Sequence, residues 1–155
     1  MVELRTITPA NEDAYFARTW NEYGKDIVKA GMTAEQARIN IEQTKKQVFE
    51  NGLLKSNQHL LNVFLEGKTI GVLWLVNRTE VAEDDWYIYD IEILQEFRGQ
   101  GLGKATMLAA EKYVMAHGGH TIGLNVFGFN TVARKLYESL DYETNAIQMK
   151  KKLLN

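Results

Sequence analysis

The fold of this chain is decided by residues 91–105, which read IEILQEFRGQGLGKA. Alternating apolar residues at the start of this stretch indicate a strand, and the glycines at positions 99, 101 and 103 indicate a turn that opens a helix. Glycine adopts a positive φ at little cost and lets the backbone approach a ligand closely. A helix that begins at such a turn points its free N–H groups and the positive end of its dipole outward. The stretch therefore predicts a backbone site for a phosphate group.

Two common phosphate-binding motifs do not match this stretch. The nucleotide P-loop requires G-x-x-x-x-G-K-[ST], whereas here Gly103-Lys104 is followed by Ala105 and the position five before Gly103 is Arg98. The dinucleotide fingerprint G-x-G-x-x-G also fails, because the glycines simply alternate with other residues. What remains is an R-x-x-G-x-G pattern over residues 98–103. Taken alone, this hexapeptide is also compatible with a surface turn before a helix.

A second motif follows at a suitable distance. After a predicted strand over residues 121–127, residues 128–143 read GFNTVARKLYESLDYE, with Asn130 placed to start a helix. The two motifs together resemble the GNAT superfamily of acyl-CoA-dependent N-acetyltransferases. In the second motif the resemblance is carried by Asn130, Ala133, Leu136, Tyr137 and Leu140. It is clear over residues 60–150, and we expect a single N-acetyltransferase domain over 1–155 with a helical acceptor-side segment over 1–55.

The pattern of the remaining chain fits that family. It predicts an initial strand over 4–7, a helix from Thr8-Pro9 to about 23–24, and a helix from a capping box at Thr33 to about 51–52. Further predicted elements are two strands flanking the turn at 66–68, a strand over 86–94, a helix over 101–117, a helix after Asn130 and a last strand within 142–153. The resemblance implies an α+β fold, with a central mixed but mostly antiparallel sheet, helices on both faces and a splayed parallel strand pair at the cofactor site.

Composition excludes several other classes of protein. A net charge of −2 argues against a nucleic-acid surface, which would be strongly basic. The absence of cysteine excludes disulfides, a thiol nucleophile and cysteine metal ligands, and the three scattered histidines indicate no metal site. Residues 1–5 lack the apolar run of a signal peptide and no apolar stretch reaches the length of a membrane span, so we expect neither. We expect a cytoplasmic enzyme with no metal, no nucleic-acid partner and no membrane partner. Dimers are frequent in the family, so a homodimer is a candidate assembly.

The resemblance assigns acetyl-CoA as the acyl donor. It implies that the backbone N–H of Ile93 stabilises the oxyanion while the pantetheine arm pairs with the strand edge. The glycine loop would bind the pyrophosphate, with Lys104 in the first helical turn offering a cation. The cofactor-binding residues expected from it are Ile93, Leu94, Arg98, Gly99, Gln100, Gly101, Leu102, Gly103, Lys104 and Asn130.

The resemblance also assigns catalytic roles. Tyr137 is the expected general acid for the coenzyme A thiolate, although a tyrosine in such a helical stripe is also a common core residue. Some family members carry a base at the position of Asn125, which cannot accept a proton. Strict alternation places Asp90 and Glu92 on one face of the strand, with Tyr87, Tyr89, Ile91 and Ile93 on the other. Glu92 is the candidate base closest to the acyl group, and a water chain to Glu92, Asp90 or a backbone carbonyl remains equally open.

The acceptor is the least determined partner. We expect its site among the N-terminal helices and the loop 79–85, whose acidic character would favour a cationic amine, although a solvated run of charge explains it as well. The most specific hypothesis is acetyl transfer to a primary amine of a small molecule or peptide. The alternatives are a non-catalytic acyl-CoA-binding or sensing module on the same fold and, more weakly, a nucleotide-phosphate binder.

Overall fold

The computed structural model describes residues 1–78 and 84–154. The chain divides into two compact units, residues 1–125 and a second unit that begins at Val126. The first unit contains the strands β1 (Glu3–Thr6), β2 (Phe49–Glu50), β3 (Leu53–Leu54), β4 (Gln58–Leu65), β5 (Lys68–Asn77), β6 (Trp86–Ile93) and β7 (Ile122–Leu124). Its helices are α1 (Pro9–Lys29), α2 (Ala34–Val48), a short 3-10 helix (Gln95–Phe97) and α3 (Leu102–Ala116), and the second unit contains α4 (Thr131–Ser139).

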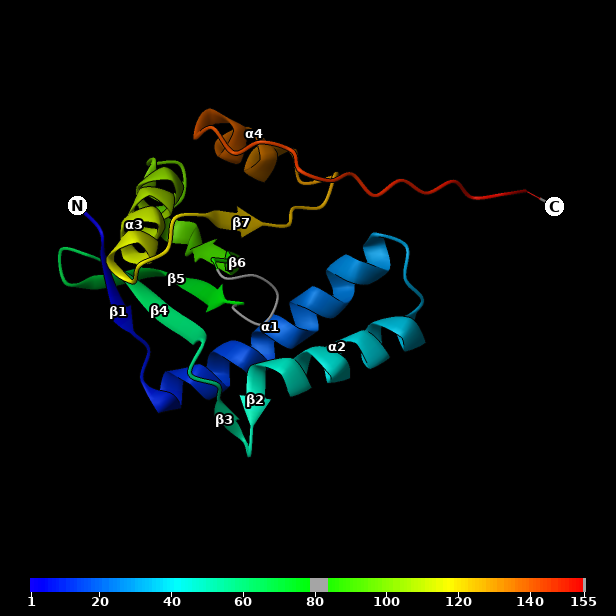
Figure 1. Cartoon of the computed structure of the whole chain (residues 1–155), viewed down its shortest axis with the longest axis horizontal. Coiled ribbons are helices and arrows are strands. Elements are labelled where there is room, and N and C mark those ends of the chain that lie inside the picture. The colour runs from blue at the N-terminus through cyan, green and yellow to red at the C-terminus, as the bar shows by residue number, and fades with distance from the viewer. Residues whose placement is uncertain (79–83, 155) are drawn as a thin grey trace. The chain divides into compact units, whose positions relative to one another are not determined.

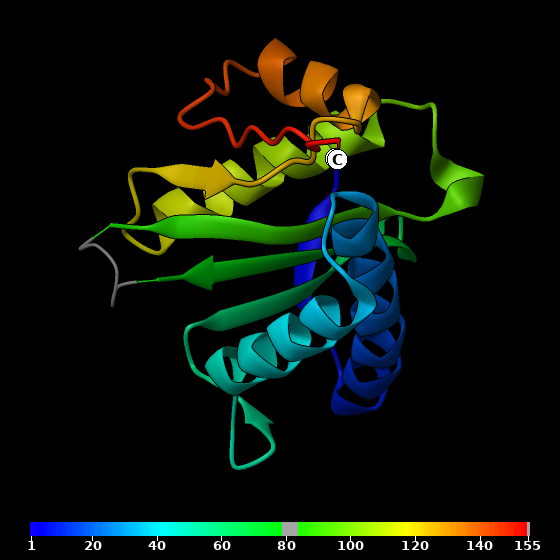
Figure 2. The same ribbon diagram turned by 90° about the vertical axis from the view of Figure 1, so that its right-hand side faces the viewer.

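The central sheet has the predicted mixed topology. Its strands lie in the order β1-β4-β5-β6-β7, with antiparallel neighbours except for the parallel pair β6–β7. In the first unit, α1 and α2 cover one face of this sheet and α3 covers the other (Figure 1, Figure 2). The predicted α+β fold with helices on both faces is therefore confirmed.

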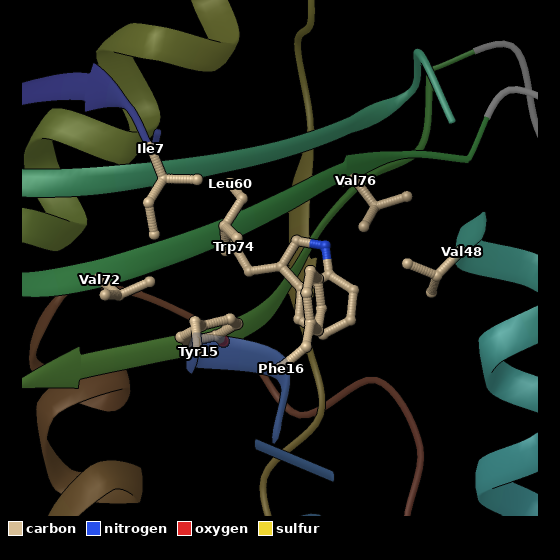
Figure 3. Packing of buried hydrophobic residues seen from close by; sticks show 8 residues of the cluster. All are labelled: Ile7, Tyr15, Phe16, Val48, Leu60, Val72, Trp74 and Val76. Carbon is tan, nitrogen blue, oxygen red and sulfur yellow. The ribbon is translucent and has the colours of Figure 1, made fainter. Parts of the chain in front are cut away.

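The core under α1 and α2 is rich in aromatic rings. Phe16 packs edge-on against Trp74 with ring centroids 5.2 Å apart, and Trp74 packs against Tyr89 at 5.0 Å. Figure 3 shows the side chains that form this cluster, which are Ile7, Tyr15, Phe16, Val48, Leu60, Val72, Trp74 and Val76. Alternate residues of β5 point to the other face, where Leu73, Leu75 and the Met107 side of α3 are fully buried. The sheet is thus buried on both faces, which fixes the position of β6.

Helix α1 is longer than predicted. The sequence favoured an end near Gly24, but the helix continues through that glycine to Lys29. A Cβ at Gly24 would lie 3.1 Å from Cδ1 of Ile41 on α2, so the missing side chain allows the two helices to approach closely. Packing therefore overrides the helix-breaking tendency of glycine, which is only about 1 kcal/mol.

Helix α2 begins as predicted and ends earlier than predicted. The hydroxyl of Thr33 accepts from the Gln36 backbone N–H at 3.1 Å, and the Gln36 side chain accepts from the Thr33 N–H at 2.9 Å, which confirms the capping box. The helix ends at Val48, and Asn51 and Gly52, with φ of 52° and 77°, form the turn of the small hairpin β2–β3. Glu66 and Gly67 have similar positive φ angles, 51° and 79°, and form the predicted β4–β5 turn.

The last predicted strand is not formed. Residues 142–154 carry no regular secondary structure, and the described part of the second unit contains no strand that could pair with them. A strand pattern needs a hydrogen-bonding partner to form a ladder, so alternating residues alone do not make one. Likewise, β7 covers only Ile122–Leu124 of the expected range 121–127.

A residue in the left-handed conformation follows the end of helix α4. Asp141 has a φ of 66°, and the Tyr142 N–H beyond it donates to the Tyr137 carbonyl at 3.0 Å. We expect Asp141→Gly to be neutral or to stabilise by up to about 1 kcal/mol, because glycine carries no Cβ penalty there. Thermal unfolding measures this change, and Asp141→Ala, which keeps the Cβ, should show no gain. A clear fall in melting temperature for the glycine variant would contradict the assigned geometry.

Within residues 1–78 and 84–154, no helix is long and apolar enough to cross a lipid bilayer. The same residues contain no cluster of three or more histidine or carboxylate side chains arranged to hold a metal ion.

Candidate active site

A β-bulge in β6 shapes the candidate site. Trp74 of β5 pairs with Asp90 and Leu75 pairs with Ile88, so Tyr89 is an extra residue. Beyond the bulge the alternation restarts, and Tyr89 packs against Trp74 on the face covered by α1 and α2 while the Asp90 carboxylate meets Tyr15 of α1. The predicted separation of Tyr87 and Tyr89 from the two carboxylates is therefore wrong, because the bulge breaks the period of two.

Strands β6 and β7 separate directly before this bulge. Their parallel pairing extends only from Trp86 to Ile88 of β6, whereas β6 itself continues to Ile93. The Leu94 N–H donates to the Ile70 carbonyl of β5 at 2.8 Å, so the polar groups of the preceding residue, Ile93, point to the opposite edge. The splay thus leaves a part of β6 beyond Ile88 that pairs with no described strand on this side, with the Ile93 N–H facing outward toward any extended ligand.

Arg98 ties the end of β6 to the glycine loop. Its Nε donates to the backbone carbonyl of Ile93 at 2.8 Å. The guanidinium therefore positions the strand end and the loop relative to one another.

The glycine loop has the predicted form. Gly99 and Gly101 have φ of 77° and 75°, and a Cβ at either position would meet no atom within 4 Å. These glycines are thus required by backbone conformation and leave open space above the loop. Gly101 is the N-cap of α3, which has no side-chain cap and no acidic residue in its first turn. With Lys104 beside it, this helix end is electropositive and suits a polyanion such as pyrophosphate.

Two carboxylates of β6 face α1, and they have different partners. Tyr15 donates its hydroxyl proton to Oδ2 of Asp90 at 2.5 Å, and burial raises the pKa of that tyrosine. Burial also raises the pKa of Asp90 to about 6, against the lowering effect of the Tyr15 hydrogen bond. Glu92 instead forms an ion pair with Arg18, whose Nη2 lies 3.3 Å from Oε2. The two groups therefore differ in their contacts.

The second unit presents the other predicted residues. Asn130 caps α4, since its Oδ1 accepts from the Ala133 N–H at 3.2 Å, and this confirms the predicted helix start. Tyr137 lies on α4 with its ring centroid 6.0 Å from that of Tyr142. The helix thus holds Tyr137 in a defined orientation within its own unit.

The predicted acceptor loop lies partly outside the described residues, which omit 79–83. At its described end, Asp85 pairs with Arg78 at 2.9 Å and Asp84 accepts from the His120 N–H at 2.8 Å. These two carboxylates therefore have structural partners within the protein.

Sequence analysis missed Tyr15 and Arg18 as parts of the site. They lie 75 and 74 residues from their partners Asp90 and Glu92. Tyr15 lies on the buried apolar face of α1, and nothing in a single sequence links it to a distant carboxylate.

Comparison with known proteins agrees with this geometry. Residues 17–142 match the model of the acetyltransferase (GNAT) family. The chain is 31% identical over 142 residues to the uncharacterised N-acetyltransferase YycN of Bacillus subtilis, covering 90% of this chain and 91% of that protein. The crystal structure of YycN superposes with a TM-score of 0.90 and 29% identity over the full length of both chains. YdgE of the same bacterium, also named an uncharacterised N-acetyltransferase, is 26% identical over 97% of each chain.

Enzymes of this family take the acetyl group from acetyl-CoA and transfer it to an acceptor substrate, which agrees with an electropositive loop beside a free strand edge. This chain belongs to the acetyltransferase (GNAT) family and is an acyltransferase.

Proposed function

We propose that the enzyme transfers an acetyl group from acetyl-CoA to a primary amine of a small molecule or peptide by direct attack. The observation that carries this proposal is the N-terminus of α3, which has no side-chain cap and is preceded by the left-handed glycines Gly99 and Gly101. Backbone N–H groups there can bind pyrophosphate oxygens without a metal ion. Lys104 would add a charge contact.

The proposed donor site runs from the loop back along β6. Its members are Ile93, Leu94, Arg98, Gly99, Gln100, Gly101, Leu102, Gly103, Lys104 and, from the second unit, Asn130. The outward-facing N–H of Ile93 is proposed to bind a carbonyl oxygen of the donor. Donors of this kind, when aimed at a developing oxyanion, typically contribute about 3 kcal/mol to transition-state stability.

The proposed chemistry is one acyl transfer with two proton movements. The amine nitrogen attacks the thioester carbon, the C–S bond breaks, and Tyr137 protonates the departing sulfur. The nitrogen gives up a proton to a carboxylate of β6, for which sequence proximity to Ile93 favours Glu92 and the buried environment favours Asp90. Membership of an enzyme family favours this hypothesis over a non-catalytic binding module.

Saturating acetyl-CoA is expected to raise the melting temperature. Ligand at about 100 times its dissociation constant stabilises by roughly 2.7 kcal/mol. For a domain of this size, that corresponds to about 5–10 °C. ATP and NAD should produce no comparable shift. No shift with millimolar acetyl-CoA would contradict the donor assignment.

A matched pair of glycine variants makes this test specific. Gly101 and Gly67 have φ of 75° and 79°, and each has open space where a Cβ would lie. Alanine at either position should cost about 1 kcal/mol of stability. Only Gly101→Ala should also lose the acetyl-CoA shift, because Gly67 lies in the β4–β5 turn. Equal shifts in both variants would argue against the loop as the phosphate site.

A further inference from the structure

We infer that Asp90, positioned by Tyr15, is the group that takes the proton from the attacking amine. The inference rests on the acetyl transfer proposed above and selects one base from the alternatives.

The position of Asp90 on β6 is the first argument. Pairing between β6 and β7 ends at Ile88, the bulge residue follows, and Asp90 is the next residue. The pantetheine arm of coenzyme A carries its thioester at the far end from the pyrophosphate, beyond a series of amides. If the pyrophosphate binds at Gly101 and the Ile93 N–H binds the acyl carbonyl oxygen, the reacting carbon lies beside the end of β6. Asp90 and Glu92 both lie on this unpaired part of the strand, so the choice between them depends on their contacts.

The contacts of Asp90 leave one oxygen available. Tyr15 donates to Oδ2, and among the described residues no other group donates a hydrogen bond to this carboxylate. The second oxygen, Oδ1, has no hydrogen bond from another described residue, and the Asp90 side chain is only partly buried. An incoming amine, or a water molecule between them, can therefore reach Oδ1 while Tyr15 holds the other oxygen in place.

The electrostatic surroundings also favour Asp90 over Glu92. Burial is the largest effect on Asp90 and raises its pKa, Glu92 and Glu22 raise it further, and Tyr15 and Arg18 lower it. The result is about 6, which is close to the value that suits a base at neutral pH. Glu92 has the Arg18 guanidinium at 3.3 Å, whereas Asp90 is hydrogen-bonded by a neutral phenol. The carboxylate of Glu92 is thus already engaged by a cation.

The protons in this step balance without another reactant. As the N–C bond forms, the nitrogen loses one proton to Oδ1 of Asp90. The C–S electron pair leaves on sulfur, which is protonated separately, and Asp90 then returns its proton to solvent. An amine that arrives as an ammonium ion must first release its extra proton to water.

Asp90→Asn is the primary test, with spermidine and a short peptide bearing a free amino terminus as probe acceptors and thiol release as the readout. We expect kcat to fall about 10²- to 10⁴-fold. The parent enzyme should lose activity below pH 6, where Asp90 is protonated, and the variant should lack this acidic limb. Asp13→Asn is the matched control, because Asp13 is an exposed aspartate on α1. This variant should keep the parental kcat and the acidic limb of the pH profile. If Glu92→Gln removes the limb and Asp90→Asn keeps it, the inference is wrong.

Tyr15→Phe tests the positioning role. Because the Tyr15 hydrogen bond lowers the pKa of Asp90, its removal should move the acidic limb to higher pH without changing the KM for acetyl-CoA. A tyrosine that only packs α1 against the sheet would change stability and leave the limb in place. An unmoved limb would therefore overturn the role of Tyr15.

A carboxyl titration by ¹³C NMR separates this inference from the proposed function, because it uses the full chain without any acceptor. One aspartate resonance should titrate near pH 6 and disappear in Asp90→Asn. A midpoint near the ordinary aspartate value of about 3.9 would overturn the inference. Acetyl-CoA binding and turnover that survive in Asp90→Asn with an unchanged limb would overturn it as well, while leaving the acetyl transfer intact. Absence of both donor binding and turnover in the parent would refute the acetyl transfer itself.

Discussion

Gly71→Ala is expected to destabilise the enzyme by about 3 kcal/mol, at the upper end of the usual cost of overpacking. Gly71 lies in β5 opposite Ile93 of β6. A Cβ at this position would lie 2.1 Å from the Glu92 carbonyl oxygen and 3.2 Å from Cα of Ile93. Both are backbone atoms, so no side-chain rotation can relieve the overlap. The two strands must separate, and the segment that moves is the one proposed to bind the acyl donor.

Thermal unfolding should show this loss as a fall of about 10 °C in melting temperature. Acetyl-CoA should also raise the melting temperature of this variant much less than that of the parent, because the end of β6 has moved. Gly128→Ala is the matched control, since its Cβ would meet no atom within 4 Å and its φ is not positive. That variant should stay within about 0.5 kcal/mol of the parent. A Gly71→Ala protein with parental stability would show that β5 and β6 are not held as closely as the structure has them.

The sequence predicted the elements that carry strong local signals. The turn at Glu66–Gly67, the capping box at Thr33 and the glycine loop each depend on residues within a few positions of one another. Their backbone conformations are set by local sterics and hydrogen bonds, so they can be predicted from a single sequence.

The features that the sequence did not predict depend on contacts between distant segments. Helix α1 continues past Gly24 because Ile41 of α2 packs there, and the bulge at Tyr89 exists only relative to the register of β5. An isolated glycine in a strand is a general signal for close backbone approach, so Gly71 could have been singled out. The partner that makes it necessary, the Glu92 carbonyl, becomes visible only in the fold.

The candidate site divides in the same way. The backbone form of the glycine loop could be predicted because positive φ angles are set by local residues, whereas its role as the donor site stays a prediction. The base was left open because the proton affinity of a carboxylate depends on its surroundings. Asp90 and Glu92 are alike in the sequence, and they differ only once Tyr15 and Arg18 of α1 are placed beside them.

Tyr137→Phe is expected to lower kcat by about 10²- to 10⁴-fold, the range typical for loss of a general acid. The thiolate of coenzyme A would then leave without a positioned proton donor. The fold should be preserved, because phenylalanine keeps the ring that contacts Tyr142 and the capping bond of Asn130 lies at the other end of α4. The KM for acetyl-CoA should change little.

Steady-state thiol release with spermidine as the acceptor measures this effect, and thermal unfolding with and without acetyl-CoA checks that binding survives. Tyr142→Phe is the matched control, since it removes the same hydroxyl group from the neighbouring ring and should leave kcat near the parental value. The pH profile adds a second criterion. Loss of the general acid should lower the rate most at alkaline pH, where solvent protonates the thiolate least, and it should leave the acidic limb assigned to Asp90 unchanged. A Tyr137→Phe enzyme with a parental rate across the whole profile would mean that the thiolate leaves unprotonated or takes its proton from water, and the acid assigned by family resemblance would have to be abandoned.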